Sequence, residues 1–252
     1  MGWTWKKEHL DVILVPSGLL IMFGYHLYLL YRYLKLPHTT TMGHENNSKV
    51  AYVERTMQID VRDRGQALTV ITTNISTATT LSSISLVLSS LIGTWLGNST
   101  KTIFTTYLIY GDTSQSIMSI KLITLLIFFL IAFASFIQTT RCFVHATFLL
   151  TMPDAEVPAS YVETAVIMGS NFWSIGMRAL YFAVTLLLWV FGPIPMFVSS
   201  VVMVGVLHNL DSDSAPLHQF RPVPSRSVLK NVGEEMAAVG RAVQQLGRPH
   251  GN

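Results

Sequence analysis

The sequence predicts an all-α, polytopic membrane protein, a bundle of about four transmembrane helices followed by an amphipathic C-terminal helix. Charged residues make up only 12% of the chain, whereas soluble domains average about 25%. The apolar residues gather in four blocks, each long enough to cross a bilayer, which takes about 20 residues of helix. Aromatic and basic residues border these blocks, as they do at membrane interfaces.

The first two spans differ in composition. The first is expected at residues 10–34, with Trp3 and Trp5 before it and Tyr31 and Tyr33 near its end. The second, at residues 68–96, is rich in serine and threonine. Small hydroxyl residues let helices approach closely and hydrogen-bond across the contact. We therefore expect the second helix to lie at the centre of the bundle.

The last two apolar blocks are irregular. The block at residues 117–150 would be about 51 Å long as one helix, which exceeds a hydrocarbon core of about 30 Å. We expect a span at 117–137 with a helical extension to 150. The fourth span, at 177–207, contains a helix break at Gly192, Pro193 and Pro195, because proline removes a backbone donor.

The chain divides into a transmembrane domain at residues 1–210 and a linker with an amphipathic tail at 211–252. Apolar residues recur every three or four positions from Val232 to Leu246. This pattern fits a short coiled coil or a helix that lies on the membrane surface. Four spans would place both termini on one side, and lysine and arginine are too evenly divided to orient the protein.

Polar residues near the predicted membrane boundaries are the candidate site residues. Gln138, Arg141 and His145 are spaced to share one helical face. With Arg64 and Arg178 they are expected near one membrane face, where they would contact an anion or a lipid headgroup. The competing interpretation is that the arginines are interfacial anchors whose charged ends extend to the headgroups.

The sequence lacks the motifs of several other classes of protein. Histidine and cysteine do not occur at metal-ligand spacings, so we expect neither a metal nor a cofactor. No hydrolase or phosphate-binding motif is present, and we expect no enzymatic activity. Basic residues do not gather on a face interleaved with aromatics, which argues against nucleic acid as a partner. Cys142 is the only cysteine, so no intrachain disulfide can form.

Several segments resemble a known family. Residues 136–150 read FIQTTRCFVHATFLL, residues 172–183 read FWSIGMRALYFA, and residues 188–197 read LWVFGPIPMF. These segments, together with residues 207–211, resemble plant members of the membrane family called domain of unknown function 599, over about residues 8–215. The resemblance implies about four spans and no assigned activity. The chain departs from the family where Gly65 follows Arg64, because an Arg-Asn pair is expected there.

These observations favour a structural or regulatory membrane protein that binds lipid or partner proteins. The alternative is a small oligomeric transporter or channel for an anionic or small polar solute. Expected partners are the bilayer, further copies of the chain or other membrane proteins, and the plasma membrane or an endomembrane is favoured as the location. Arg141 and Arg178 facing each other in a cavity would favour transport, whereas arginines directed at headgroups would favour the structural role.

Overall fold

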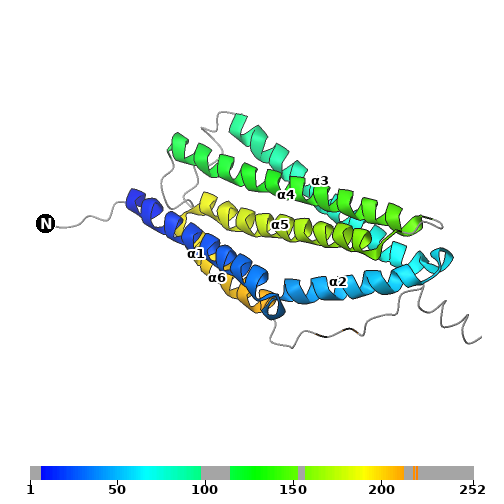
Figure 1. The fold of residues 1–252 in the computed structure, drawn as a ribbon. Coiled ribbons are helices and arrows are strands. Elements are labelled where there is room, and N and C mark those ends of the chain that lie inside the picture. Colours follow the sequence, from blue (N-terminus) through cyan, green and yellow to red (C-terminus); the bar gives the residue numbers. More distant parts are fainter. Residues whose placement is uncertain (1–6, 98–113, 153–156, 213–217, 219, 221–252) are drawn as a thin grey trace, which may run out of the picture.

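The computed structural model describes residues 7–97, 114–152, 157–212, 218 and 220, and they are almost entirely helical (Figure 1). The helices are α1 (Lys7–Lys35), α2 (Thr41–Gln58), α3 (Gly65–Gly97), α4 (Gln115–Thr151), α5 (Ala159–Phe191) and α6 (Pro193–Asp211). All except α2 are long and apolar enough to cross a membrane. The predicted all-α membrane bundle is therefore confirmed, and its candidate spans number five, close to the expected four.

The additional span arises at the predicted helix break. Gly192 has a φ of 148°, a backbone angle that residues other than glycine rarely adopt, and Pro193 begins α6. A kinked helix would keep its direction, but here α6 turns back and runs beside α1. Gly18 lies against Ser200, and Tyr25 bonds Asp211. The expectation of one broken span at residues 177–207 was therefore wrong. The break separates two spans, α5, which begins at Ala159 and ends at Phe191, and α6, which begins at Pro193.

The three longest helices exceed the thickness of the hydrocarbon core by the widest margin. Helices α3, α4 and α5 contain 33, 37 and 33 residues, or about 50 to 55 Å at 1.5 Å per residue. The hydrocarbon core measures about 30 Å. Helix α6 has only 19 residues, about the length that such a core requires. The three long helices therefore extend beyond the bilayer at the end where α2 lies (Figure 1).

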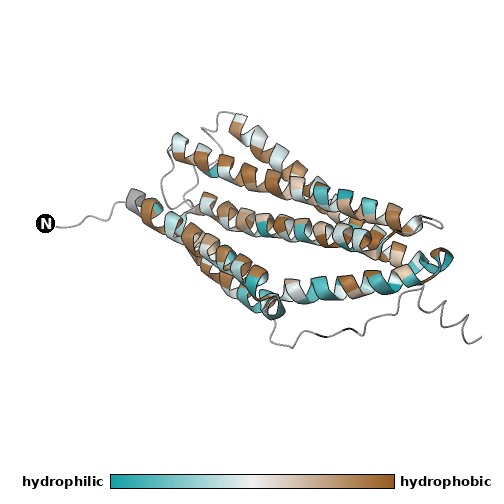
Figure 2. Cartoon of the chain, viewed as in Figure 1, coloured by the Kyte–Doolittle hydropathy of each residue, from teal (hydrophilic) through white to brown (hydrophobic). Residues whose placement is uncertain are grey.

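Two of the three hydrophobic cores among the described residues correspond to these two parts of the fold, and the third, of Ala132, Phe136 and Ala179, joins α4 to α5. In the membrane layer, Val15, Leu122, Leu186 and Met196 join α1, α4, α5 and α6. In the second part, called here the α2 layer, a core that includes Val53, Ile71, Phe143, Leu150 and Val162 joins α2 to α3, α4 and α5. Figure 2 shows hydrophilic residues along α2, as expected for a helix outside the hydrocarbon core.

Helix α3 lies at the edge of the bundle, so the prediction that it is central was wrong. It packs mainly on α4, and most of its serine and threonine side chains are exposed. These hydroxyl groups do not need a neighbouring helix, because they donate to carbonyls four residues earlier in α3. Examples are Thr73 to Thr69, Thr77 to Thr73 and Thr80 to Ser76, each at 2.9 Å.

The tail contacts α2 at the two residues that the structure describes beyond residue 212. Asn47 donates to the His218 carbonyl at 2.9 Å, and the Arg55 guanidinium lies 5.3 Å from the centre of the Phe220 ring. The predicted amphipathic C-terminal helix lies outside the described residues.

The two membrane faces differ in their number of basic residues. Because α1 and α6 run in the same direction, the start of α1 and the end of α6 lie at opposite faces, and not at one face as expected. Among the described residues, the face on which α2 lies holds seven basic residues outside the cavity described below: Arg32, Lys35, Lys49, Arg55, Arg62, Arg64 and Arg141. The opposite face holds Lys7 and Lys121.

We expect the α2 face to be cytoplasmic, since lysine and arginine accumulate in cytoplasmic segments. Epitope tags at the two termini of the full chain would test this by protease protection in sealed vesicles whose cytoplasmic face is outward. The C-terminal tag should be digested without detergent, and the N-terminal tag only after detergent is added. Both tags on the same side would contradict the five-span arrangement.

Candidate functional site

A polar cluster marks the α2 end of the membrane layer, where α1, α5 and α6 meet. Arg178 of α5 forms two hydrogen bonds to Asp211, the last residue of α6, at 2.8 and 3.1 Å. Tyr25 of α1 donates to the same carboxylate at 2.8 Å. Two parallel contacts between a guanidinium and a carboxylate hold both groups in one orientation. The cluster therefore connects three spans at a defined depth.

The end of α1 is attached to the end of α6 just beyond this cluster. Arg32 donates to the Thr39 hydroxyl and carbonyl and to the Ser212 hydroxyl, at 3.2, 2.5 and 3.0 Å. Thr40 and Ser212 form an isolated antiparallel bridge. These contacts fix the direction in which the chain leaves the membrane layer and enters α2.

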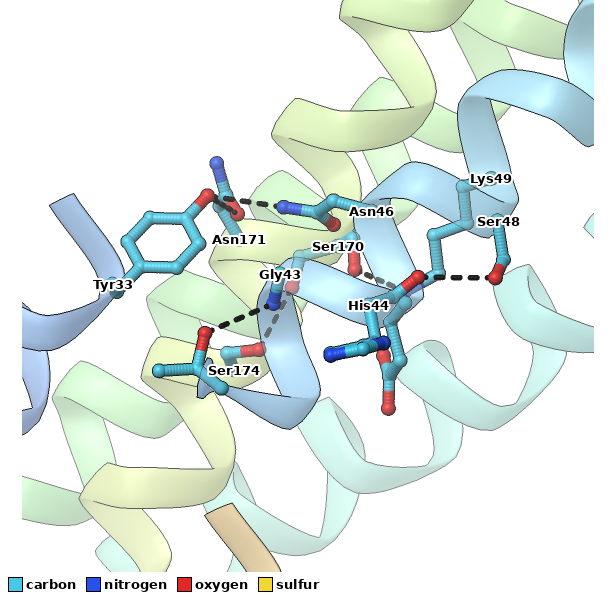
Figure 3. Close-up of polar contacts among 11 residues, drawn as sticks. Tyr33, Gly43, His44, Asn46, Ser48, Lys49, Ser170, Asn171 and Ser174 are labelled. Carbon is cyan, nitrogen blue, oxygen red and sulfur yellow. Dashed lines mark hydrogen bonds and ion pairs between the residues drawn. The ribbon is translucent and has the colours of Figure 1, made fainter. Parts of the chain in front are cut away.

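Close approach of the backbone at Gly43 determines how α2 begins. A Cβ atom at this position would lie 2.0 Å from the Pro37 carbonyl oxygen, so only glycine fits. The Gly43 amide donates to the Thr40 hydroxyl at 3.2 Å, and this bond caps α2 (Figure 3). The tight corner brings the first turns of α2 against α5.

Polar side chains then join α1, α2 and α5 (Figure 3). The Tyr33 hydroxyl accepts from Asn46 at 3.0 Å and donates to Asn171 at 3.4 Å. Lys49 donates to the Ser170 hydroxyl at 2.5 Å and pairs with Glu45 at 2.9 Å. Each helix thus contributes side chains to one continuous polar junction.

A cavity of about 300 Å³ lies between α1 and α5 beside this junction. Its polar lining comes from His26, Tyr33, Asn171, Ser174 and Arg178, and its apolar lining from Leu29, Leu30, Met42 and Ile175. A mostly apolar pocket with a few convergent polar groups is typical of a ligand site. The volume is at the lower end of the range for such pockets, about 300 to 1,000 Å³.

Two buried polar atoms at this site have no hydrogen-bond partner among the described residues. They are His26 Nε2 and Asn46 Oδ1. His26 Nδ1 lies 2.7 Å from the Met22 carbonyl, which requires a proton on Nδ1. Nε2 of a neutral ring is then an acceptor. Because buried polar atoms are normally satisfied, this lone pair indicates a place for a ligand donor.

Arg64, one of the predicted anion contacts, has a different role. Its side chain is 5% exposed and donates to three backbone carbonyls. Nε bonds Ile59 at 3.0 Å, Nη1 bonds Leu150 at 2.9 Å and Nη2 bonds Met57 at 2.9 Å. These carbonyls belong to the ends of α2 and α4, which lack partners within their own helices. Arg64 therefore fastens helix ends together.

Gln138, Arg141 and His145 do share one face, as their spacing predicted. They line a groove of about 870 Å³ between α4 and α5, together with aromatic residues that include Phe148 and Tyr161. Arg178 is absent from the described lining of this groove and lies beside α1 and α6. The expected meeting of Arg64, Arg141 and Arg178 was therefore wrong, because each arginine occupies a separate environment.

Several residues of the site were missed by reasoning from the sequence. Asp211 ends the last span, where a single carboxylate resembles an ordinary boundary residue. Tyr33, Asn46 and Asn171 are common boundary residues, and only the placement of α2 brings them together. Asp11 and Lys121 form a second buried pair, near the opposite face. Their isolation within apolar blocks was a usable signal, since charges inside spans are costly.

The five apolar helices, the two cores and the interfacial polar cavity define a helical membrane protein. The chain belongs to DUF599, described as a family of proteins of unknown function, whose model matches residues 13–216. Searches of curated proteins and of solved structures found no match.

Proposed function

We propose that this membrane protein binds the headgroup of a phospholipid in the cavity between α1 and α5. His26 carries the proposal, because its ring lines the cavity and its buried Nε2 has no partner among the described residues. The donors of Asn171, Ser174 and Arg178 line the other side. The ligand must then combine acceptor oxygens with a donor of its own. A phosphate esterified to an alcohol that carries a hydroxyl or ammonium group has this chemistry.

The position of the cavity supports the same ligand. Arg178 lies where α6 ends, so the cavity is at headgroup depth, with Leu29, Leu30 and Ile175 towards the membrane layer. Basic pockets between spans on the cytoplasmic side are known sites for anionic headgroups. Arg178 uses two of its five N–H groups for Asp211, which leaves donors for a phosphate oxygen. The apolar residues would contact the glycerol and the first chain carbons.

The proposal predicts selectivity among phospholipids, measurable by native mass spectrometry of the purified full chain. Phosphatidylethanolamine, phosphatidylserine and phosphatidylglycerol carry a headgroup donor that phosphatidylcholine lacks. We expect them to bind about fivefold more tightly than phosphatidylcholine, since one net hydrogen bond is worth about 1 kcal/mol. His26→Phe should remove this difference, and Ser174→Phe, which fills the cavity, should weaken binding of all four lipids.

Arg141→Gln is the matched control, since Arg141 lies in the separate groove between α4 and α5. It should leave the affinities unchanged. Equal binding of all four lipids by the wild type, or no effect of either cavity variant, would contradict the proposed site.

A further inference from the structure

A second ionic cluster lies near the opposite end of the membrane layer. Lys121 of α4 is fully buried, and its Nζ lies 4.0 Å from Asp11 Oδ1 of α1. Trp189 of α5 donates to the same carboxylate oxygen at 3.1 Å. Lys121 Nζ lies 5.5 Å from the centre of the Trp189 ring. A lysine buried at this depth is costly, and such residues commonly mark pathways for ions or substrates.

The two clusters lie along one seam. On α5, Arg178 and Trp189 are eleven positions apart, or about 16 Å along the helix axis. Helix α1 contributes to both clusters through Asp11 and Tyr25. The seam between α1 and α5 thus carries two cations at different depths, each held by a carboxylate.

The middle of this seam is aromatic, with one polar group. His26 contacts the Phe182 ring at 4.8 Å between centroids, and Phe182 also contacts Phe23 at 4.8 Å and Phe128 at 5.0 Å. Aromatic ring contacts carry no hydrogen bond, so these rings can separate without breaking one. Along the seam, the groups follow in the spatial order Arg178, His26, the aromatic cluster and Lys121.

The helix packing allows the seam to open. Helix α1 packs mainly on α6, which also packs on α5, whereas α4 packs on both α3 and α5. Helix α1 has little direct packing on α5, so the seam separates α1 from α4 and α5. Among the described residues, the pairs Asp11–Lys121 and Asp211–Arg178 connect α1 and α6 to α4 and α5. In each pair a phosphate could replace the carboxylate as the partner of the cation.

We infer that the seam between α1 and α5 is a path along which phospholipid headgroups cross between the two leaflets. Arg178 and Lys121 are the two positions at which the phosphate binds, and His26 lies between them. The lipid tails remain in the hydrocarbon while the headgroup passes between α1 on one side and α4 and α5 on the other. This inference rests on the proposed headgroup site, and it adds transbilayer movement to binding.

The test is a lipid-scrambling assay with the full chain in phosphatidylcholine vesicles that contain phosphatidylglycerol and a trace of headgroup-labelled fluorescent phosphatidylethanolamine. Dithionite bleaches only label in the outer leaflet. Vesicles with the protein should lose nearly all fluorescence, and empty vesicles only the outer-leaflet part. Lys121→Met with Asp11→Leu should slow the loss at least about tenfold, which corresponds to about 1.4 kcal/mol on the barrier.

Removing both members of a buried ion pair is better tolerated than removing one, but the Trp189 N–H loses its acceptor, so the assay uses double-variant protein that retains the helical circular dichroism of the wild type. Lys121→Arg keeps the cation and should retain scrambling. This variant distinguishes loss of the charge from a purely structural effect of replacing Lys121. Arg141→Gln should also retain it. Wild-type vesicles that bleach like empty ones would overturn the inference, as would unchanged rates in the folded double variant. Lipid binding measured on the same protein would show whether the headgroup site itself survives.

Discussion

Alanine at Gly43 is expected to destabilise the protein by about 3 kcal/mol or more, at the upper end of overpacking costs. Its Cβ would lie 2.0 Å from the Pro37 carbonyl oxygen and 2.7 Å from the Pro37 carbonyl carbon. Both are backbone atoms, so no flexible side chain can move aside. The corner between α1 and α2 must shift, and the contacts of Tyr33 and Lys49 with α5 would be lost.

Thermal unfolding of the purified full chain in detergent would measure this effect. Gly24→Ala and Gly65→Ala are matched controls, because no atom lies within 4 Å of the position that their Cβ would take. Both should unfold at or above the wild-type temperature, since alanine favours helix over glycine by about 1 kcal/mol. An unchanged unfolding temperature for Gly43→Ala would show that the corner differs from the structure described.

Replacing Arg64 by methionine should cost about 2 kcal/mol or more, because the buried Leu150 carbonyl and the part-buried carbonyls of Ile59 and Met57 lose their donor, and a buried group left unpaired costs about 1 to 3 kcal/mol. Methionine keeps much of the apolar volume, so the effect isolates the hydrogen bonds. Arg64→Lys should recover only part of the stability, since an ammonium lacks the planar fork that reaches three separated carbonyls.

Unfolding by heat would rank these variants against the wild type. Arg62→Met is the control, because Arg62 is exposed and two residues away. The prediction fails if Arg64→Met is as stable as Arg62→Met. Lipid selectivity offers an independent check, since folded Arg64 variants should bind lipids as the wild type does.

Hydrophobicity was sufficient to predict the class of fold, because a 20-residue apolar block has few alternatives to a membrane span. It was insufficient at Gly192, where the apolar block continues through a complete reversal of the chain. Composition also misplaced α3. A hydroxyl-rich helix can pack closely on neighbours or satisfy its own side chains, and the sequence does not distinguish these outcomes.

The arginines show the same limit at the level of the site. Spacing within one helix placed Gln138, Arg141 and His145 on a common face, since helical periodicity is local. It could not reveal that Arg64 would reach the Leu150 carbonyl, 86 residues further along the chain. It also could not reveal that Arg178 would pair with Asp211. Such partners depend on how helices are arranged, and that arrangement is set by the whole chain.

The neighbouring positions of α1 and α6 have a consequence for biosynthesis. The helix made first acquires its main partner only after the last helix has left the ribosome. Until then Asp11 enters the bilayer without Lys121 and Trp189, which are made much later. Proteins that depend on such distant contacts complete assembly late and expose unfinished surfaces meanwhile. Nascent chains of this protein should therefore be substrates for membrane chaperones until residue 211 is inserted.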